Sequence, residues 1–264
     1  MSEKGRMARW SWKPLHGWRR FLGEVGIIVL GVLIALGLGA VATEIGWRVD
    51  ASAARKAIGL ELGEALGTAI ERTRFAPCVE RRLDQLALLV DRAATTGRLP
   101  PLGDIHSPPL RPWNRGIWDS SMSAQTTAHF NRADLSAYVA AYQYIDLLGA
   151  TNRQETAAWT AIYSLVGPGR PLLPAEAGDL RRAVGIARGA NRFMVVGSVR
   201  LQQEIEAYKL PYDGTAMRAF SDRPSSDKEI CQPVDAEVPA SYGQSPFRTT
   251  LDRARKSPIK PRTQ

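Results

Sequence analysis

Two cysteines and three histidines are the residues with the greatest capacity for chemistry in this chain of 264 residues. The histidines, His16, His106 and His129, stand far apart, and none has a second ligand at metal-binding spacing. The sequence has no phosphate-binding glycine loop, nucleophile elbow, zinc-protease helix or Cys-x-x-Cys pair. We therefore expect a protein that is not an enzyme and holds no cofactor or metal, with His129 packing at a helix entry.

Cys78 and Cys231 are the one covalent pairing that the sequence offers. In an oxidising compartment an even pair of cysteines favours a disulfide. The bond would close a loop of about 150 residues and stabilise the fold by up to about 5 kcal/mol in the chain-entropy description. Two unrelated free thiols are the alternative.

Residues 25–43 contain no charged side chain and are rich in Val, Ile, Leu, Gly and Ala. About 20 such residues, rising about 1.5 Å each, span the hydrocarbon core of a bilayer. Residues 1–24 carry six basic and two acidic side chains, an excess that keeps this end in the cytoplasm. The sequence predicts a single-pass protein of a bacterial inner membrane, with its bulk in the periplasm and the lipid bilayer as its first partner.

A cleaved signal peptide is the alternative, because Ala40-Val41-Ala42 has the small-x-small form that signal peptidases cut. Cleavage after Ala42 would leave a secreted helical protein. Signal peptides usually run about 15 to 30 residues, which favours a retained anchor here. A third interpretation, the buried core helix of a soluble protein, leaves the flanking charges and tryptophans unexplained.

Small residues recur every fourth position on two helix faces. Within the anchor they are Gly31, Ala35 and Gly39. Just after it they are Gly59, Gly63 and Gly67. Such spacing lets two helix backbones approach closely, and it predicts a homodimer through the anchor and the second face. Chance recurrence in a chain with 23 glycines is the alternative.

The net charge of +9 does not indicate a nucleic-acid-binding protein. Residues 44–208 carry 19 basic and 17 acidic side chains, so the excess lies in the two ends of the chain. No basic face interleaved with aromatic residues appears. The carboxylates of the body alternate with Arg and Lys along the helices, and we expect them on solvated faces with no buried pair.

Residues 44–208 have the pattern of an all-α protein, an antiparallel helical bundle with long coiled-coil-like helices. Two seams with 3.5-residue spacing are joined by the short loop 167–175. The first comprises Tyr138, Tyr142, Ile145, Gly149, Asn152, Thr156, Trp159, Tyr163 and Val166, and the second comprises Leu180, Val184, Ala187, Asn191, Met194, Ser198, Leu201, Ile205 and Tyr208.

Two segments do not fit a regular pattern. Residues 98–117 hold five prolines and are expected to be irregular. Residues 209–264 are rich in Pro, Ser and charge, and we expect a mostly disordered tail that Cys231 tethers.

A polar layer interrupts the two seams. Laid antiparallel, they bring Asn152, Thr156 and Asn191 together. A buried polar layer costs stability and fixes register. Two alternatives remain: a helix broken at Gly149, with Asn152 as a cap, or a small ligand pocket in the bundle.

Several segments resemble those of known proteins. "FLGEVGIIVLGVLIAL" is similar to the GE-apolar-GILIAL anchor of a family of uncharacterised bacterial single-pass inner-membrane proteins. "APCVERRLDQLALLV", "IWDSSMSAQTTAHF", "NRQETAAW" and "LVGPGRPLLPAEAGDLRRAV" also resemble segments of that family. The resemblance covers roughly residues 17–208, and Gly149 departs from it. It implies a retained anchor and a structural role for Cys78, and it implies no activity or functional residues.

We thus expect a membrane-anchored periplasmic helical protein with a structural or protein-interaction role and a protein partner that the sequence does not identify. A ligand-sensing bundle that acts through a partner is the second hypothesis.

Overall fold

A computed structural model describes residues 17–223 and 227–234. It divides into two units, Met1–Ala53 and Ala54–Gln264, which are described separately. The helix α1, Trp18–Thr96, belongs to both, and Pro77 lies inside it without ending it.

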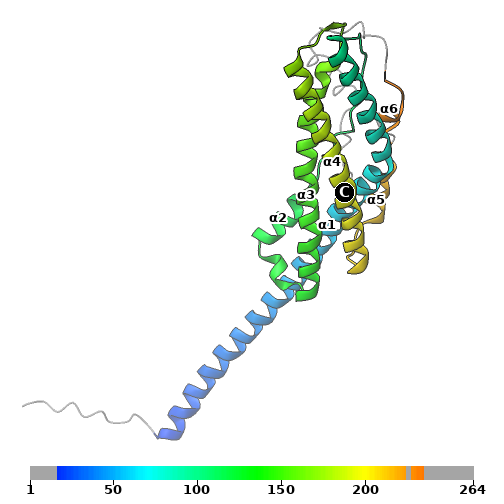
Figure 1. The fold of residues 1–264 in the computed structure, drawn as a ribbon. Coiled ribbons are helices and arrows are strands. Elements are labelled where there is room, and N and C mark those ends of the chain that lie inside the picture. The colour runs from blue at the N-terminus through cyan, green and yellow to red at the C-terminus, as the bar shows by residue number, and fades with distance from the viewer. Residues whose placement is uncertain (1–16, 224–226, 235–264) are drawn as a thin grey trace, which may run out of the picture. The chain divides into compact units, whose positions relative to one another are not determined.

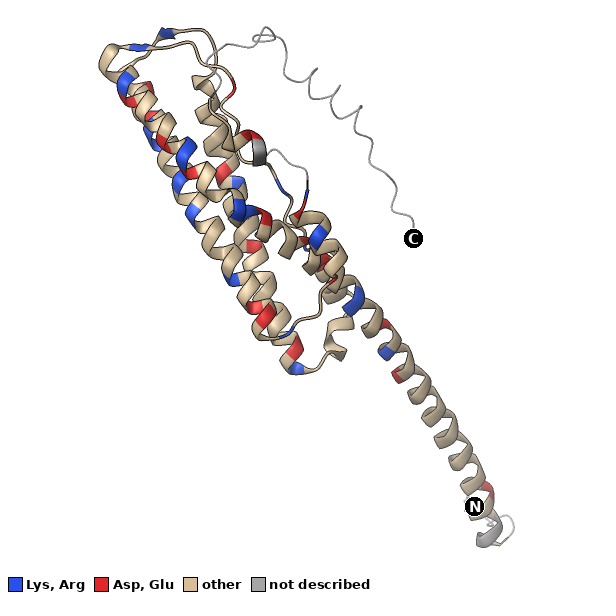
Figure 2. Cartoon of the chain, turned by 90° about the vertical axis from the view of Figure 1, so that its right-hand side faces the viewer, with Lys and Arg blue, Asp and Glu red and all other residues tan. Residues whose placement is uncertain are grey.

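The first unit consists of the beginning of α1. The helix here contains the one stretch of the described residues that is long and apolar enough to cross a membrane. Figure 2 shows a long part of this ribbon without charged residues. The apolar side chains are exposed, and Ile27, Leu36 and Leu38 are 66–73% accessible. The predicted membrane-spanning segment therefore lies in a helix that is long and apolar enough to cross a bilayer, by length and composition.

The second unit is an antiparallel helical bundle, so the predicted fold class is correct (Figure 1). Its long helices are the second half of α1, α3 (Arg132–Ile162) and α4 (Pro174–Ala207). Asn131 begins α3 as an N-cap, because its Oδ1 accepts a bond of 2.8 Å from the backbone N–H of Asp134. The helix α3 is continuous through Gly149, so a break there is excluded.

One apolar core joins the three long helices. The face of α1 that carries Val79, Leu83 and Leu86 packs with Trp159 of α3 and Val184 of α4. All five side chains are at most 3% exposed. Burial at this level contributes about 1.5–3 kcal/mol for each large apolar side chain. This core holds the bundle together and fixes the positions of the polar residues around it.

Short elements close the bundle. The helix α2 (Gly116–Ser123) and the turns η1 (Thr126–His129) and η2 (Tyr163–Leu165) lie near the ends of α3. The strands β1 (Arg98–Leu99) and β2 (Arg170–Pro171) pair antiparallel. They join the segment after α1 to the loop before α4.

Residues 211–221 are ordered against α1, which corrects part of the predicted disordered tail. This stretch contains the helix α5 (Gly214–Ser221), and α6 (Asp227–Cys231) follows. Asp213 caps α5 and its backbone N–H donates to the Gly59 carbonyl at 2.8 Å. Composition alone missed this helix because its stability comes from packing on the glycine face of α1. The tail beyond residue 234 lies outside the described residues.

Candidate functional site

Five charged side chains lie buried in the bundle, contrary to the expectation that the carboxylates are solvated. They are Glu61, Glu71, Arg72 and Arg82 of α1 and Glu155 of α3, each at most 4% exposed. Glu61 and Arg72 are eleven residues apart, which is three helical turns, so they share the face that carries the apolar stripe. That spacing is the only signal in the sequence, and it does not predict burial, because charged residues beside an apolar helix stripe usually face solvent.

Arg72, Glu155 and Asn191 form a polar layer between the three long helices. Nη2 of Arg72 donates to Oε1 of Glu155 at 2.6 Å and to Oδ1 of Asn191 at 2.8 Å. The Asn191 amide in turn donates to the carbonyl oxygen of Ala76 at 3.3 Å. Burial raises the pKa of Glu155, and the charge of Arg72 opposes that effect. The layer therefore links one residue of each long helix.

Of the three residues predicted to form a polar layer, only Asn191 lies in this one. Asn191 belongs to it, whereas Asn152 and Thr156 face the proline-rich segment. The amide of Asn152 donates to the backbone oxygen of Arg111 at 3.0 Å, and the hydroxyl of Thr156 donates to the Asn152 carbonyl at 2.8 Å. The prediction failed because it assumed a single buried seam on α3, and α3 is covered on a second face by residues 104–113.

Glu61 fixes the start of α2. Its carboxylate accepts from the backbone N–H groups of Ile117 and Trp118 at 2.9 and 3.1 Å, and from the hydroxyl of Tyr142 at 2.6 Å. The Trp118 ring stacks on that of Tyr142, with centroids 4.7 Å apart. Burial and the hydrogen bond to Glu61 raise the pKa of Tyr142. A carboxylate at a helix N-terminus is favourable because the free N–H groups point at it.

Two further buried charges hold irregular chain against α1. Glu71 accepts two bonds of 2.7 Å from the Arg111 guanidinium, a bidentate pair. Arg82 donates to the backbone oxygens of Ile105 and Gln232. Each of these charged side chains thus forms hydrogen bonds with an irregular segment that has few backbone hydrogen bonds of its own.

Cys78 and Cys231 lie at disulfide distance, as the sequence predicted. Their sulfur atoms are 1.99 Å apart and their Cα atoms 4.9 Å apart. The bond holds α6 beside the last quarter of α1.

The second glycine face is filled from within the chain. Gly59, Gly63 and Gly67 lie under residues 211–221, and a Cβ added at Gly67 would come within 2.7 Å of Cβ of Phe220. The close approach that the spacing predicts is therefore made to α5. The anchor face is different: no atom lies within 4 Å of where a Cβ would stand at Gly31 or Gly39.

A polar pocket of about 320 Å³ lies between α3, the proline-rich segment and α6. Its lining includes Asp104, His106, Asn152, Glu155, Tyr163 and Glu229. The backbone of His106 is left-handed, with φ at 50°. The backbone N–H of Ser107 donates to the Tyr163 hydroxyl at 3.3 Å. The sequence did not predict that Asn152 and His106 line one pocket, because this depends on the path of an irregular segment.

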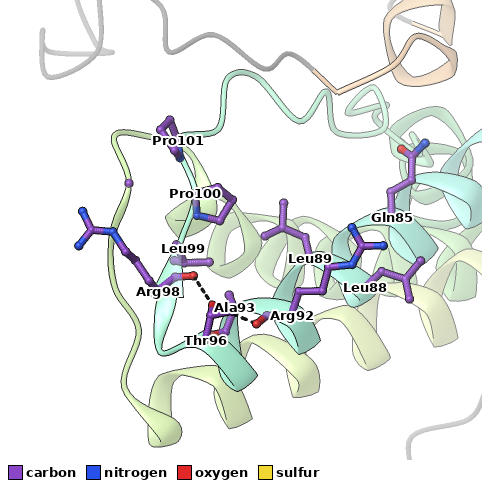
Figure 3. A pocket seen from close by; sticks show the side chains of 11 residues that line it. Gln85, Leu88, Leu89, Arg92, Ala93, Thr96, Arg98, Leu99, Pro100 and Pro101 are labelled. Atoms are coloured by element: carbon purple, nitrogen blue, oxygen red, sulfur yellow. Dashed lines mark hydrogen bonds between the residues drawn. The ribbon is translucent and has the colours of Figure 1, made fainter.

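A second cavity of about 980 Å³ is an open groove between the last turns of α1 and residues 98–101 (Figure 3). Its walls are mostly apolar, from Leu88 and Leu89 on the helix and Leu99 and Pro100 on the segment. In Figure 3 the Arg92 side chain reaches toward Gln85. Its apolar lining distinguishes this groove from the polar pocket.

Within residues 17–223 and 227–234, no group of three or more His, Cys, Asp or Glu side chains could hold a metal ion. His129 ends η1 and is exposed. The polar pocket presents carboxylates, hydroxyls, an amide and the imidazole of His106, all of which can form hydrogen bonds with a small polar molecule.

A comparison of the chain with protein-family models, curated proteins and solved structures finds no match.

Proposed function

We propose that this chain is a bitopic membrane protein that displays a helical bundle outside the cytoplasm and acts through protein interaction. The observation that carries the proposal is the exposure of the apolar side chains at the start of α1, where Ile27 is 73% accessible. Leaving such a face in water costs about 25 cal/mol per Å² of apolar surface, whereas a bilayer removes that cost. The basic residues before the helix favour an N-terminus in the cytoplasm.

The partner best supported is a second copy of the chain, bound through the anchor. Two faces of α1 carry small residues four apart, and the one at Gly59, Gly63 and Gly67 is occupied by the chain's own residues 211–221. The face at Gly31, Ala35 and Gly39 is open. Small residues at this spacing let two membrane helices pack at short distance.

The anchor dimer is tested by Gly31→Ile and Gly39→Ile, with Gly37→Ile as the matched control. Gly37 lies in the same apolar stretch, is equally open, and points about 120–160° away from Gly31, Ala35 and Gly39. We expect both face variants to abolish cross-linked dimer in washed membranes and the control to retain it. Equal dimer from all three variants would rule out this face.

The topology is tested by the intact mass of the protein from washed membranes, alkylated with and without reduction. A full-length mass that takes up two alkyl groups only after reduction supports an anchor and an exported bundle. A mass that begins at Thr43 would replace the anchor with a cleaved signal and the dimer with a secreted helical protein.

A ligand-sensing bundle is the second candidate, and the polar pocket is the observation that favours it. Its volume of about 320 Å³ suits a small molecule.

A further inference from the structure

We infer that the polar pocket binds a small, water-soluble organic amine in its ammonium form. This inference rests on the ligand-sensing proposal and gives it a chemical class of ligand. It draws on the charge of the pocket, the atoms it presents and its size.

The pocket has an excess of negative charge. Its lining includes the carboxylates of Asp104, Glu155 and Glu229, and none of the described residues that line it is Lys or Arg. The charge of Glu155 is already balanced by Arg72 at 2.6 Å. Nδ1 of His106 lies 3.8 Å from the carboxylate of Asp104, which stays 48% exposed. Asp104 and Glu229 therefore give the pocket a field that favours a cation over a neutral molecule or an anion.

The same pocket offers acceptors for ammonium hydrogens. An ammonium group has three N–H donors and no acceptor. Thr156, Thr160, Tyr163 and Asn152 line the pocket, and each side chain has an oxygen that can accept such a bond. Trp159 also lines the pocket, and an aromatic ring attracts a cation that lies over its face.

The walls of the pocket are held in place before any ligand arrives. Glu155 is fixed by Arg72, and Asn152 by the Arg111 carbonyl. Glu229 lies on α6, two residues before the Cys231 that is joined to Cys78. A preformed site spends less of its binding free energy on ordering side chains. A volume of about 320 Å³ accommodates a diamine of a few carbons.

The experiment is calorimetric titration of the full chain in neutral detergent with 1,4-diaminobutane. Two matched probes have nearly the same length: 1,4-butanediol is neutral and succinate is anionic. We expect saturable 1:1 binding of the diamine and no heat from the other two. Asp104→Asn and Glu229→Gln are expected to weaken it about threefold to tenfold each. Asp179→Asn, which removes an exposed carboxylate from α4, is the control and leaves it unchanged.

Thr156→Trp provides a second test that does not alter charge. Thr156 is exposed on α3 and lines the pocket, so the larger side chain fills the cavity while the helix stays intact. Loss of diamine binding with an unchanged melting temperature supports the inference. Absence of diamine binding to the wild type would overturn it, and so would binding that the carboxylate variants do not weaken. If butanediol or succinate binds and Thr156→Trp abolishes that binding, the ligand is not an amine. The ligand-sensing proposal would still hold in that case.

Discussion

The carboxylate of Glu155 lies 2.6 Å from the guanidinium of Arg72, and both side chains are only 4% exposed. Removing two charges from water costs several kcal/mol each, and their attraction offsets this only when the geometry is good and other bonds complete it. Asn191 supplies one of those bonds from a third helix. The pair therefore ties the register of α1 to α3 and α4, because a shift along any of the helices would leave a buried charge without its partner.

Breaking this pair is expected to be costly. Arg72→Met or Glu155→Leu alone should lower the free energy of unfolding by about 3–5 kcal/mol, since each strands the other charge. The double variant should lose less than the sum, with a coupling of about 0.5–3 kcal/mol. Urea unfolding followed by tryptophan fluorescence measures both. Breaking the exposed pair between Asp179 and Arg182 should change stability by less than about 0.5 kcal/mol. A double variant that loses the sum of the two single losses would show that the two charges do not depend on each other.

Substitution of the filled glycine face should separate packing from helix propensity. Gly67→Ala places a Cβ against the Met217 carbonyl and Phe220, so α5 must move. We expect a loss of stability and faster hydrogen exchange in residues 214–221. Gly189→Ala is the control, because nothing lies within 4 Å of its added Cβ. It should stabilise the protein by about 1 kcal/mol through helix propensity alone. Stabilisation by Gly67→Ala would mean that α5 does not pack there.

Alkaline pH should destabilise the bundle partly through Tyr142. Its pKa is raised by burial and by the bond to Glu61, so the folded state holds the phenol proton more tightly than the unfolded chain. That contribution is complete below the ordinary tyrosine pKa of about 10 and is lost as pH rises above it.

Tyr142→Phe isolates the effect. We expect the fall in unfolding free energy above pH 10 to become shallower than in the wild type, by up to about 1.4 kcal/mol per pH unit. At neutral pH the same variant should cost about 1–3 kcal/mol, because Glu61 loses a donor. The exposed Tyr208→Phe serves as the control and should retain the wild-type slope. Identical slopes in all three proteins would contradict the role assigned to Tyr142.

Reduction of the disulfide should lower stability by up to about 5 kcal/mol and release α6, because the bond closes a loop between residues 153 positions apart. The readouts are urea unfolding with and without reductant and hydrogen exchange in residues 227–234. The double variant Cys78→Ser, Cys231→Ser should have the unfolding free energy of the reduced wild type, and adding reductant should not change it. An oxidised protein no more stable than the reduced one would contradict this expectation.

The long helices could be predicted because their stability depends on periodic local signals. The seam of α4 from Leu180 to Ile205 is buried as expected, and Asn131 caps α3 through its side chain. The cysteine pair followed from the oxidising compartment that the apolar stretch implied. These features need only spacing, composition and residue type.

The second face of α3 could not be predicted. Its cover is a proline-rich segment whose path depends on buried charges at Glu71 and Arg82, and a sequence pattern does not reveal which carboxylate meets which arginine. The position of α5 could not be predicted for a related reason. Its sequence is amphipathic and follows the Asp213 cap, but a helix of eight residues depends on packing for its stability. Only the space above Gly63 and Gly67 gives it a place to pack.

The disulfide also determines how the chain would carry tension. A pull applied between the first turns of α1 and the residues after Cys231 travels along α1 to Cys78 and crosses the sulfur bridge. The helices α3 and α4 lie inside the closed ring and bear none of it. With the bridge cut, the same pull would load the bundle itself, and unfolding it would release 153 residues, which is about 500 Å of extended polypeptide. The redox state of one bond thus decides whether this protein behaves as a short strut or as a long tether.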